Sequence, residues 1–252
     1  MPIQYLRGFT HPERTDEANR RLGRSLAFVA GAANAGGFLA FGQYTSHMSG
    51  IVSSLADNLA LGSIDLFASG LASLASFIFG AAVSTVCINW GRRRALRSQY
   101  GLPLVLEATL LLCFGLLGSN LEAHRILFVP ATVALLCFVM GLQNAMITKI
   151  SKAEIRTTHM TGLVTDIGIE LGRLFYWNGP RNGMMRHAAG FVRCDRQRLA
   201  LLASLLGSFL LGGIAGAIGF KHIGFSATVP LAALLVALAV VPLIDDMLGE
   251  QA

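Results

Sequence analysis

Charged residues are scarce in this chain, and their scarcity excludes an ordinary soluble domain. Only 13% of the 252 residues are charged, 54% are hydrophobic and the mean hydropathy is +0.59, whereas soluble domains are about a quarter charged. The net charge is +6, but the basic residues lie between apolar runs rather than in one patch, so we expect no nucleic-acid partner. The composition predicts an all-α polytopic membrane protein that is surrounded by membrane lipids.

Patterns that support enzymatic or metal chemistry are also lacking. The four cysteines form no CxxC pair, so the sequence predicts neither a disulfide framework nor a metal site. It shows no nucleophile triad, metal-ligand cluster or phosphate loop, and we therefore expect no enzyme activity and no cofactor. The polar N-terminal segment lacks the cleavage site of a signal peptide, which predicts a cytoplasmic lead over residues 1–24.

What is present is a duplicated phrase. Thr45-Ser46-His47-Met48-Ser49-Gly50 returns as Thr157-Thr158-His159-Met160-Thr161-Gly162, 112 residues later. Upstream, residues 28–35 match residues 138–145 at five of eight positions, with an offset of 110, and this match pairs Asn34 with Asn144. The chain is therefore two related units, which we place at residues 25–126 and 127–244, followed by a tail of residues 245–252.

Six apolar runs are long enough to cross the hydrocarbon core as helices, which takes about 20 residues. They cover residues 25–44, 66–90, 102–118, 127–148, 199–220 and 226–244. A shorter apolar segment follows each phrase, at residues 51–62 and 163–174, and a helix of that length is too short to span. The sequence predicts six transmembrane helices and two re-entrant half-helices in a 3+3 inverted repeat.

The basic residues distinguish two topologies. If the short helices enter the membrane and return, both termini, the Arg92 loop and residues 149–198, which contain the basic loop 173–198, lie on one side. That side then holds 18 of the 20 Lys and Arg residues. If the short helices cross, eight basic residues move to the outside. The positive-inside rule favours the first arrangement, with cytoplasmic N- and C-termini. Three spans per half then place the halves in opposite orientations, as in many secondary transporters.

The phrases and the matched asparagines form the candidate binding site for a small solute or ion. Ser49 or Thr161 can cap the helix that follows, and free N–H groups at such a terminus attract an anion or a carbonyl oxygen. Histidine changes its charge near neutral pH. Alternatively, these polar groups only satisfy backbone and packing within the bilayer. The candidate residues are Asn34, Ser46, His47, Ser49, Gly50, Asn144, Thr158, His159, Thr161 and Gly162.

Four acids in apolar surroundings are candidates for coupling transport to a proton or cation. They are Asp57, Glu107, Asp166 and Glu170. Asp166 and Glu170 are four residues apart and share one helix face. None of the four has an acidic counterpart in the other half. They therefore either couple transport to a proton or cation on one side of the membrane only, or simply face the basic loop on the interior side.

The repeated segments resemble the YoaK-like family of uncharacterised bacterial membrane proteins, over residues 25–244. The matching stretches are Gly31-x-x-Asn34-Ala35, His47-Met48-Ser49-Gly50, Gly141-Leu142-Gln143-Asn144-Ala145 and Thr158-His159-Met160-Thr161-Gly162. The resemblance implies a bacterial inner-membrane location and no particular substrate. Family members typically have Asp in place of Asn34 and Thr-Gly-Asn in place of Ser49-Gly50-Ile51, which implies a difference in coupling or in ligand.

The sequence thus predicts a transporter or channel for a small solute or ion that works by alternating access. The alternative is a non-transporting regulatory or partner-binding subunit, with a closed apolar centre and histidines packed against each other. A membrane enzyme acting on lipid would need polar groups that converge on a lateral opening. A bundle of this size is also compatible with a homo-oligomer.

Overall fold

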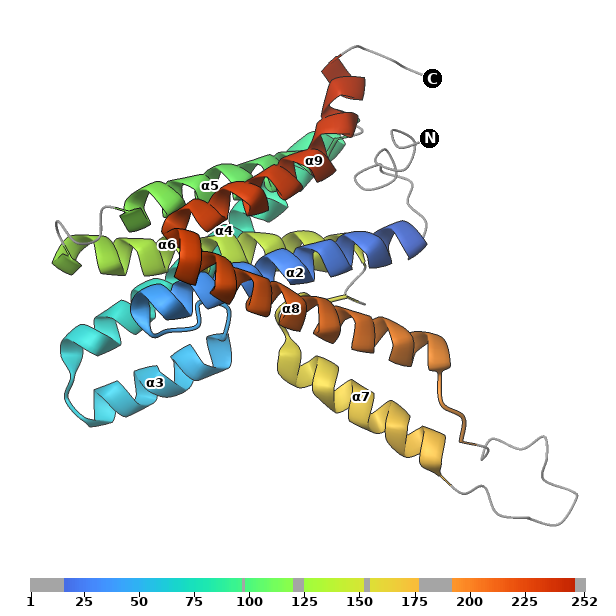
Figure 1. Ribbon diagram of the computed structural model, residues 1–252, viewed down its shortest axis with the longest axis horizontal. Coiled ribbons are helices and arrows are strands. Elements are labelled where there is room, and N and C mark those ends of the chain that lie inside the picture. The colour runs from blue at the N-terminus through green and yellow to red at the C-terminus, as the bar shows by residue number, and fades with distance from the viewer. Residues whose placement is uncertain (1–15, 97, 120–124, 152–154, 177–191, 248–252) are drawn as a thin grey trace, which may run out of the picture.

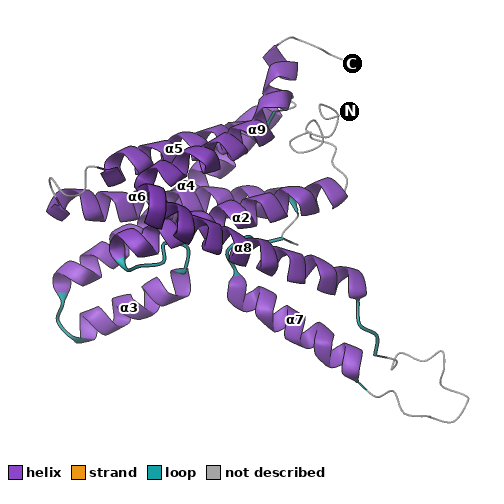
Figure 2. Ribbon diagram, viewed as in Figure 1, coloured by secondary structure: helices purple, strands orange, loops and turns teal. Residues whose placement is uncertain are grey.

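The computed structural model describes residues 16–96, 98–119, 125–151, 155–176 and 192–247, and these ranges contain helices and loops but no strand (Figures 1 and 2). The elements are α2 (Asp16–Phe41), α3 (Met48–Ala60), α4 (Ile64–Arg93), α5 (Gly101–Ser119), α6 (Arg125–Ile150), α7 (Met160–Phe175), α8 (Arg196–Ile223), the 3-10 turn η1 (Gly224–Ala227) and α9 (Thr228–Met247). The predicted all-α class is confirmed for this part of the chain.

Several helices are long and apolar enough to cross a membrane. Four such stretches occur in the described residues: Ile64–Arg93, Gly101–Ser119, Val129–Ile150 and Arg196–Val240. The last stretch has 45 residues and bends at η1, where Gly224 has a φ of 60°, so that α9 leaves α8 at an angle (Figure 1). Large apolar side chains such as Val86 and Leu116 are 65% and 69% exposed, as lipid-facing residues are. The protein is therefore a membrane protein.

Helix α2 crosses α8 with their backbones in contact. A methyl group added to Gly31 would meet the carbonyl oxygen of Phe209, and one added to Gly212 would meet the carbonyl oxygen of Phe28. Small residues permit such close approach between helices in a membrane.

Helix α4 crosses α6 in the same way. A methyl group on Gly80 would meet the carbonyl oxygen of Phe138, and one on Gly141 would meet that of Phe77. Each crossing is therefore built from two reciprocal glycine and carbonyl contacts, and each glycine follows a phenylalanine by three positions.

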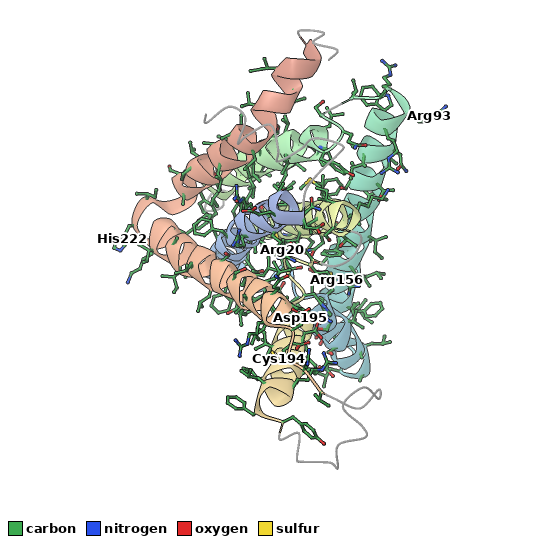
Figure 3. The ribbon with its side chains drawn as sticks, turned by 90° about the vertical axis from the view of Figure 1, so that its right-hand side faces the viewer. Arg20, Arg93, Arg156, Cys194, Asp195 and His222 are labelled. Atoms are coloured by element: carbon green, nitrogen blue, oxygen red, sulfur yellow. The ribbon has the colours of Figure 1, made fainter. Side chains whose placement is uncertain are left out.

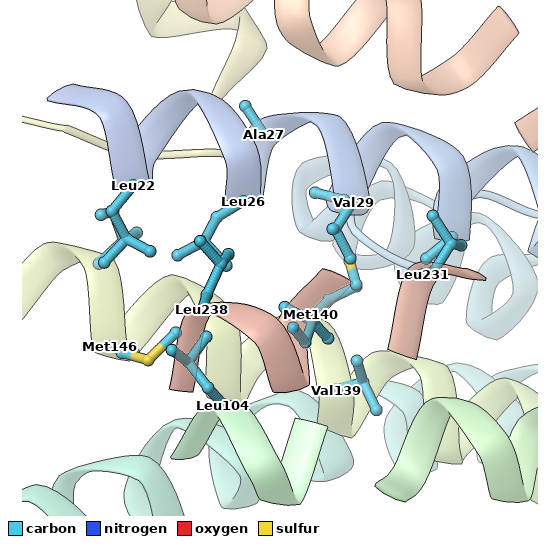
Figure 4. Close-up of a cluster of buried hydrophobic side chains, with 14 of the residues drawn as sticks. Leu22, Leu26, Ala27, Val29, Leu104, Val139, Met140, Met146, Leu231 and Leu238 are labelled. Atoms are coloured by element: carbon cyan, nitrogen blue, oxygen red, sulfur yellow. The ribbon is translucent and has the colours of Figure 1, made fainter. Parts of the chain in front are cut away.

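The core lies where α2, α5, α6 and α9 meet (Figure 4). Leu26, Leu104 and Met140 are fully buried there, and Leu238 is 5% exposed. Buried Gln143 of α6 donates from Nε2 to the carbonyl oxygen of Leu26 at 2.6 Å. This hydrogen bond joins α6 to α2 inside the apolar core.

The two short helices lie at the edge of this core: α3 has no buried residue, whereas Leu163 of α7 belongs to the buried cluster. Helix α3 packs on α4, and α7 packs on α8. Their N-terminal ends lie near the middle of the molecule, and their C-terminal ends point to opposite ends of it (Figure 1). Both begin three residues before the predicted 51–62 and 163–174, because the repeated phrase itself forms the first helical turn.

Other boundaries also differ from the expected ones. Helix α2 begins at Asp16, inside the expected lead 1–24, with acidic residues in its first turn and an ion pair between Arg21 and Glu17 one turn apart, both of which favour a helix start. Helix α9 continues to Met247, into the expected tail. Much of the expected loop 173–198 lies outside the described residues, as do residues 1–15 and 248–252.

Candidate functional site

The two repeated phrases fold in the same way. His47 is the N-cap residue of α3, with φ −93° and ψ 73°, and His159 is the N-cap residue of α7, with φ −82° and ψ 60°. The prediction that Ser49 or Thr161 caps these helices was wrong. The N–H groups of Met48 and Met160 already bond back to the carbonyls two residues before them, at 3.3 and 2.9 Å, so each helix begins before its predicted cap.

Neither N-cap histidine makes a side-chain capping bond. Instead, each imidazole lies over the first turn of its helix. A methyl group added to Gly50 would meet the ring of His47, and one added to Gly162 would meet the ring of His159. The two phrases therefore need glycine at this position, because any side chain there would displace the imidazole.

The matched asparagines hold the phrases to the preceding long helices. Oδ1 of Asn34 accepts from the N–H and the hydroxyl of Ser46, at 3.3 and 3.2 Å. Oδ1 of Asn144 accepts from the hydroxyl of Thr158 at 2.9 Å, and its Nδ2 donates to the carbonyl oxygen of Met140 at 2.8 Å. In both halves, therefore, an asparagine side chain accepts a hydrogen bond from the Ser or Thr that precedes the histidine.

A cavity of ≈ 980 Å³ lies between the N-terminal turns of α3 and α7. Eight of the ten candidate binding residues line it: Asn34, Ser46, His47, Ser49, Asn144, Thr158, His159 and Thr161. Gly50 and Gly162 lie under the two imidazoles. Segments that are more than a hundred residues apart in sequence therefore meet around one volume.

Sequence reasoning missed Arg156, Phe77 and Phe209, which also line this cavity. In the view of Figure 3, Arg156 lies near the middle of the molecule, whereas Arg93 lies at the outer end of α4. Arg156 aligns with Tyr44 in the duplication. Because the two residues differ, the repeat did not single out Arg156 as a candidate. The phenylalanines were detectable, because both belong to a repeated Phe-x-x-Gly pattern.

The acids on α7 do not line the cavity. Oδ2 of Asp166 accepts from Arg198 at 3.0 Å. Glu170 is buried, pairs with Arg173 at 2.7 Å and accepts from the N–H of Asp195 at 2.9 Å. The contacts with Arg198 and Asp195 fasten α7 to the start of α8, whereas the pair with Arg173 lies within α7.

The remaining acids are also away from the cavity. Asp57 is exposed on α3, and Glu107 is fully buried in α5 with neither carboxyl oxygen hydrogen-bonded in the described residues. Over the same residues, no group of three or more His, Cys, Asp and Glu could hold a metal ion. The structure thus brings together the candidate binding residues but not the candidate coupling residues.

Comparison with known proteins supports the resemblance of the repeated segments at the level of the family. No curated protein and no solved structure matches this chain. A family model does match it over residues 22–241, which include both phrases and both crossings. The chain belongs to the family described as "Protein of unknown function (DUF1275)", a description that fits the uncharacterised YoaK-like proteins.

Proposed function

We propose that this protein transports a small solute across the bacterial inner membrane, with the cavity between α3 and α7 as its central binding site. The observation that carries this proposal is that equivalent residues of the two halves line one cavity. Discontinuous helices from two inverted repeats meet at the binding site of many secondary transporters.

The packing of the helices supports an inverted repeat of three spans per half. The duplication pairs α2 with α6, α3 with α7, and α4 with α8. Under this exchange the α2–α8 contact becomes the α6–α4 contact, and the α3–α4 contact becomes the α7–α8 contact; both pairs of contacts occur. Helices α5 and α9 pack on each other. We therefore assign six spans to α2, α4, α5, α6, α8 and α9, with α3 and α7 as re-entrant half-helices.

The proposed orientation follows from the directions of the short helices. Their C-terminal ends lie at opposite ends of the molecule (Figure 1), so one half-helix enters from each face of the membrane. We place both termini in the cytoplasm, because this leaves 18 of the 20 Lys and Arg residues on the cytoplasmic side, as the positive-inside rule requires. The phrase at His47 then enters from outside, and the phrase at His159 enters from inside.

Alternating access requires parts that move relative to each other. The backbone contacts of the two crossings make α2 with α8 one rigid pair and α4 with α6 another. Each pair carries one half-helix, α7 on α8 and α3 on α4. Rocking of the two pairs would open the cavity first to one side and then to the other.

The alternative, a regulatory or partner-binding subunit, predicts a closed apolar centre with the histidines packed on each other. The cavity and the exposure of both His47 and His159 favour transport instead.

Solute flux into liposomes tests this proposal. Proteoliposomes would be placed in isosmotic neutral, anionic and cationic solutes, and swelling would be followed by light scattering. We expect at least one solute to enter faster than into protein-free liposomes.

The double variant Ser49→Trp, Thr161→Trp fills the cavity from two exposed positions and should abolish this entry. The control Ser53→Trp, exposed on α3 outside the cavity lining, should not. Entry that is unaffected by the double variant, or no entry of any solute, would contradict transport.

A further inference from the structure

The cavity contains a positive charge and no described negative charge. Among the described residues that line it, Arg156 is the one Lys or Arg, and none is Asp or Glu. Arg156 is exposed and makes no ion pair within the described part of the chain. The acids on α7 are already paired, Asp166 with Arg198 and Glu170 with Arg173. The guanidinium of Arg156 is therefore available to a molecule in the cavity.

Backbone N–H groups add donors at two places. In the first turn of α3, the N–H groups of Ser49 and Gly50 make no backbone hydrogen bond in the described structure, and the same holds for Thr161 and Gly162 in α7. Ser49 and Thr161 line the cavity. Helices of 13 and 16 residues thus direct the positive ends of their dipoles toward one volume, where an anion is stabilised.

Asn34 supplies an independent sign of a ligand. Its side chain is only 8% exposed, and its Oδ1 is occupied by Ser46. Its Nδ2 donates to no atom in the described residues, although Asn34 lines the cavity. The equivalent Nδ2 of Asn144 is bonded to Met140. This Nδ2 is not one of the fully buried unpaired polar atoms of the described residues, so it is open to the cavity and can donate to an acceptor of an occupant.

Part of the lining is apolar, and the cavity is too large for a bare ion. Phe77 and Phe209 reach the cavity from α4 and α8, and Met48 and Met160 reach it from the two short helices. The volume of ≈ 980 Å³ lies at the upper end of the range for pockets that bind organic ligands, about 300 to 1,000 Å³. The occupant therefore has an apolar body as well as an acceptor group.

We propose that the cavity selects an organic carboxylate, with Arg156 as the residue that discriminates charge. The planar guanidinium matches a carboxylate in shape and charge. The carboxylate binds Arg156, the amide of Asn34 and the N-terminal turns, while the apolar body lies against Phe77 and Phe209. This inference rests on the proposed transport function, since it names the class of solute.

Three probes of one shape separate charge from size: benzoate, benzamide and benzylammonium. Each would be added to the purified protein in detergent at constant ionic strength, because salt screens exposed charges. A ligand that binds only the folded state raises the midpoint of thermal unfolding. We expect benzoate to raise it in a concentration-dependent way, while benzamide, benzylammonium and acetate do not. Equal effects of benzoate and benzylammonium would overturn the selection for anions, and equal effects of benzoate and acetate would overturn the role of the apolar lining.

The variant Arg156→Gln tests the assignment of the discriminating residue. We expect its affinity for benzoate to be roughly tenfold to hundredfold lower, the effect of losing a hydrogen bond to a charged group. The control Arg93→Gln removes an exposed arginine at the outer end of α4 (Figure 3) and should leave the affinity unchanged. Unchanged affinity in Arg156→Gln would refute the assignment.

Uptake of the same probes into proteoliposomes distinguishes this inference from the proposed function. Binding of benzoate without its uptake would support the anion site and contradict the transport function. Uptake of benzylammonium but not of benzoate would support the transport function and contradict the selection for carboxylates.

Discussion

Gly141 of α6 lies against the backbone carbonyl of Phe77 in α4. The duplication relates this contact to the one between Gly31 of α2 and Phe209 of α8, which has the same form. The pattern Phe-x-x-Gly occurs on all four crossing helices, and each phenylalanine supplies the carbonyl that meets a glycine of the partner helix. The crossings are thus fixed by backbone shape rather than by interlocking side chains.

Replacing Gly212 with Ala should separate α8 from α2, because the new methyl group would meet the carbonyl of Phe28. We expect the free energy of unfolding to fall by about 1 to 3 kcal/mol, the usual cost of overpacking. Gly207 in the same helix has no neighbour within 4 Å of an added methyl group, so Gly207→Ala should leave stability unchanged or raise it. Thermal unfolding in detergent checks both, and equal stability of the two variants would contradict the contact.

Neutralising Glu170 should loosen α7 from α8. Its carboxylate accepts from the N–H of Asp195, the N-cap residue of α8, and hydrogen bonds to charged groups contribute about 1.5 to 3 kcal/mol. Its pair with Arg173 lies within α7. We expect Glu170→Gln to lower the unfolding midpoint, and Asp57→Asn, an exposed acid on α3, to leave it unchanged. A Glu170→Gln variant with full stability but no solute uptake would instead indicate the coupling role.

Removing the imidazole of His47 should affect function more than stability. The ring makes no capping bond and lies exposed at the cavity, and substitutions at such positions usually change stability by about 0.5 kcal/mol or less. We expect His47→Ala to unfold at the same temperature as the wild type and to take up solute more slowly. His222→Ala, at the outer end of α8 (Figure 3), is the control for uptake. A large loss of stability in His47→Ala would show a packing role.

Replacing the buried Glu107 should stabilise the protein. Neither carboxyl oxygen has a hydrogen-bond partner in the described residues, and an unpaired buried polar group costs about 1 to 3 kcal/mol. We expect Glu107→Leu to raise the unfolding midpoint and to leave solute uptake unchanged. If uptake were lost while stability rose, Glu107 would take part in coupling.

The sequence predicted the parts of the site that the duplication preserves. Asn34 and Asn144, and His47 and His159, were identified because each has a counterpart at the same place in the other half. Arg156 was not, since its counterpart is Tyr44, and its position beside the cavity depends on how α7 is placed by α8. The caps were misassigned because hydroxyl residues favour helix N-termini in general, whereas here the turn closes before Ser49 and Thr161.

The sequence also could not predict which helix packs against which. Gly212 and Gly216 are four residues apart, a spacing typical of close helix contacts, and they lie against Phe28 and Ala32 of α2. Nothing in that spacing tells which helix is the partner, because any small-residue face fits any other.

The central claim is that the two half-helices enter the membrane from opposite faces, and side-specific labelling of single cysteines tests it most directly. Leu61 follows α3 and is 78% exposed, and Tyr176 follows α7 and is 59% exposed. In a chain whose native cysteines are replaced by Ala, Leu61→Cys and Tyr176→Cys would be treated with a membrane-impermeant thiol reagent on right-side-out and inside-out vesicles. The outward-facing Ile78→Cys, in the middle of α4 and 60% exposed, is the unlabelled control. We predict that Leu61→Cys reacts only from outside and Tyr176→Cys only from inside; reaction of both from the same side would contradict the inverted repeat and the transport mechanism built on it.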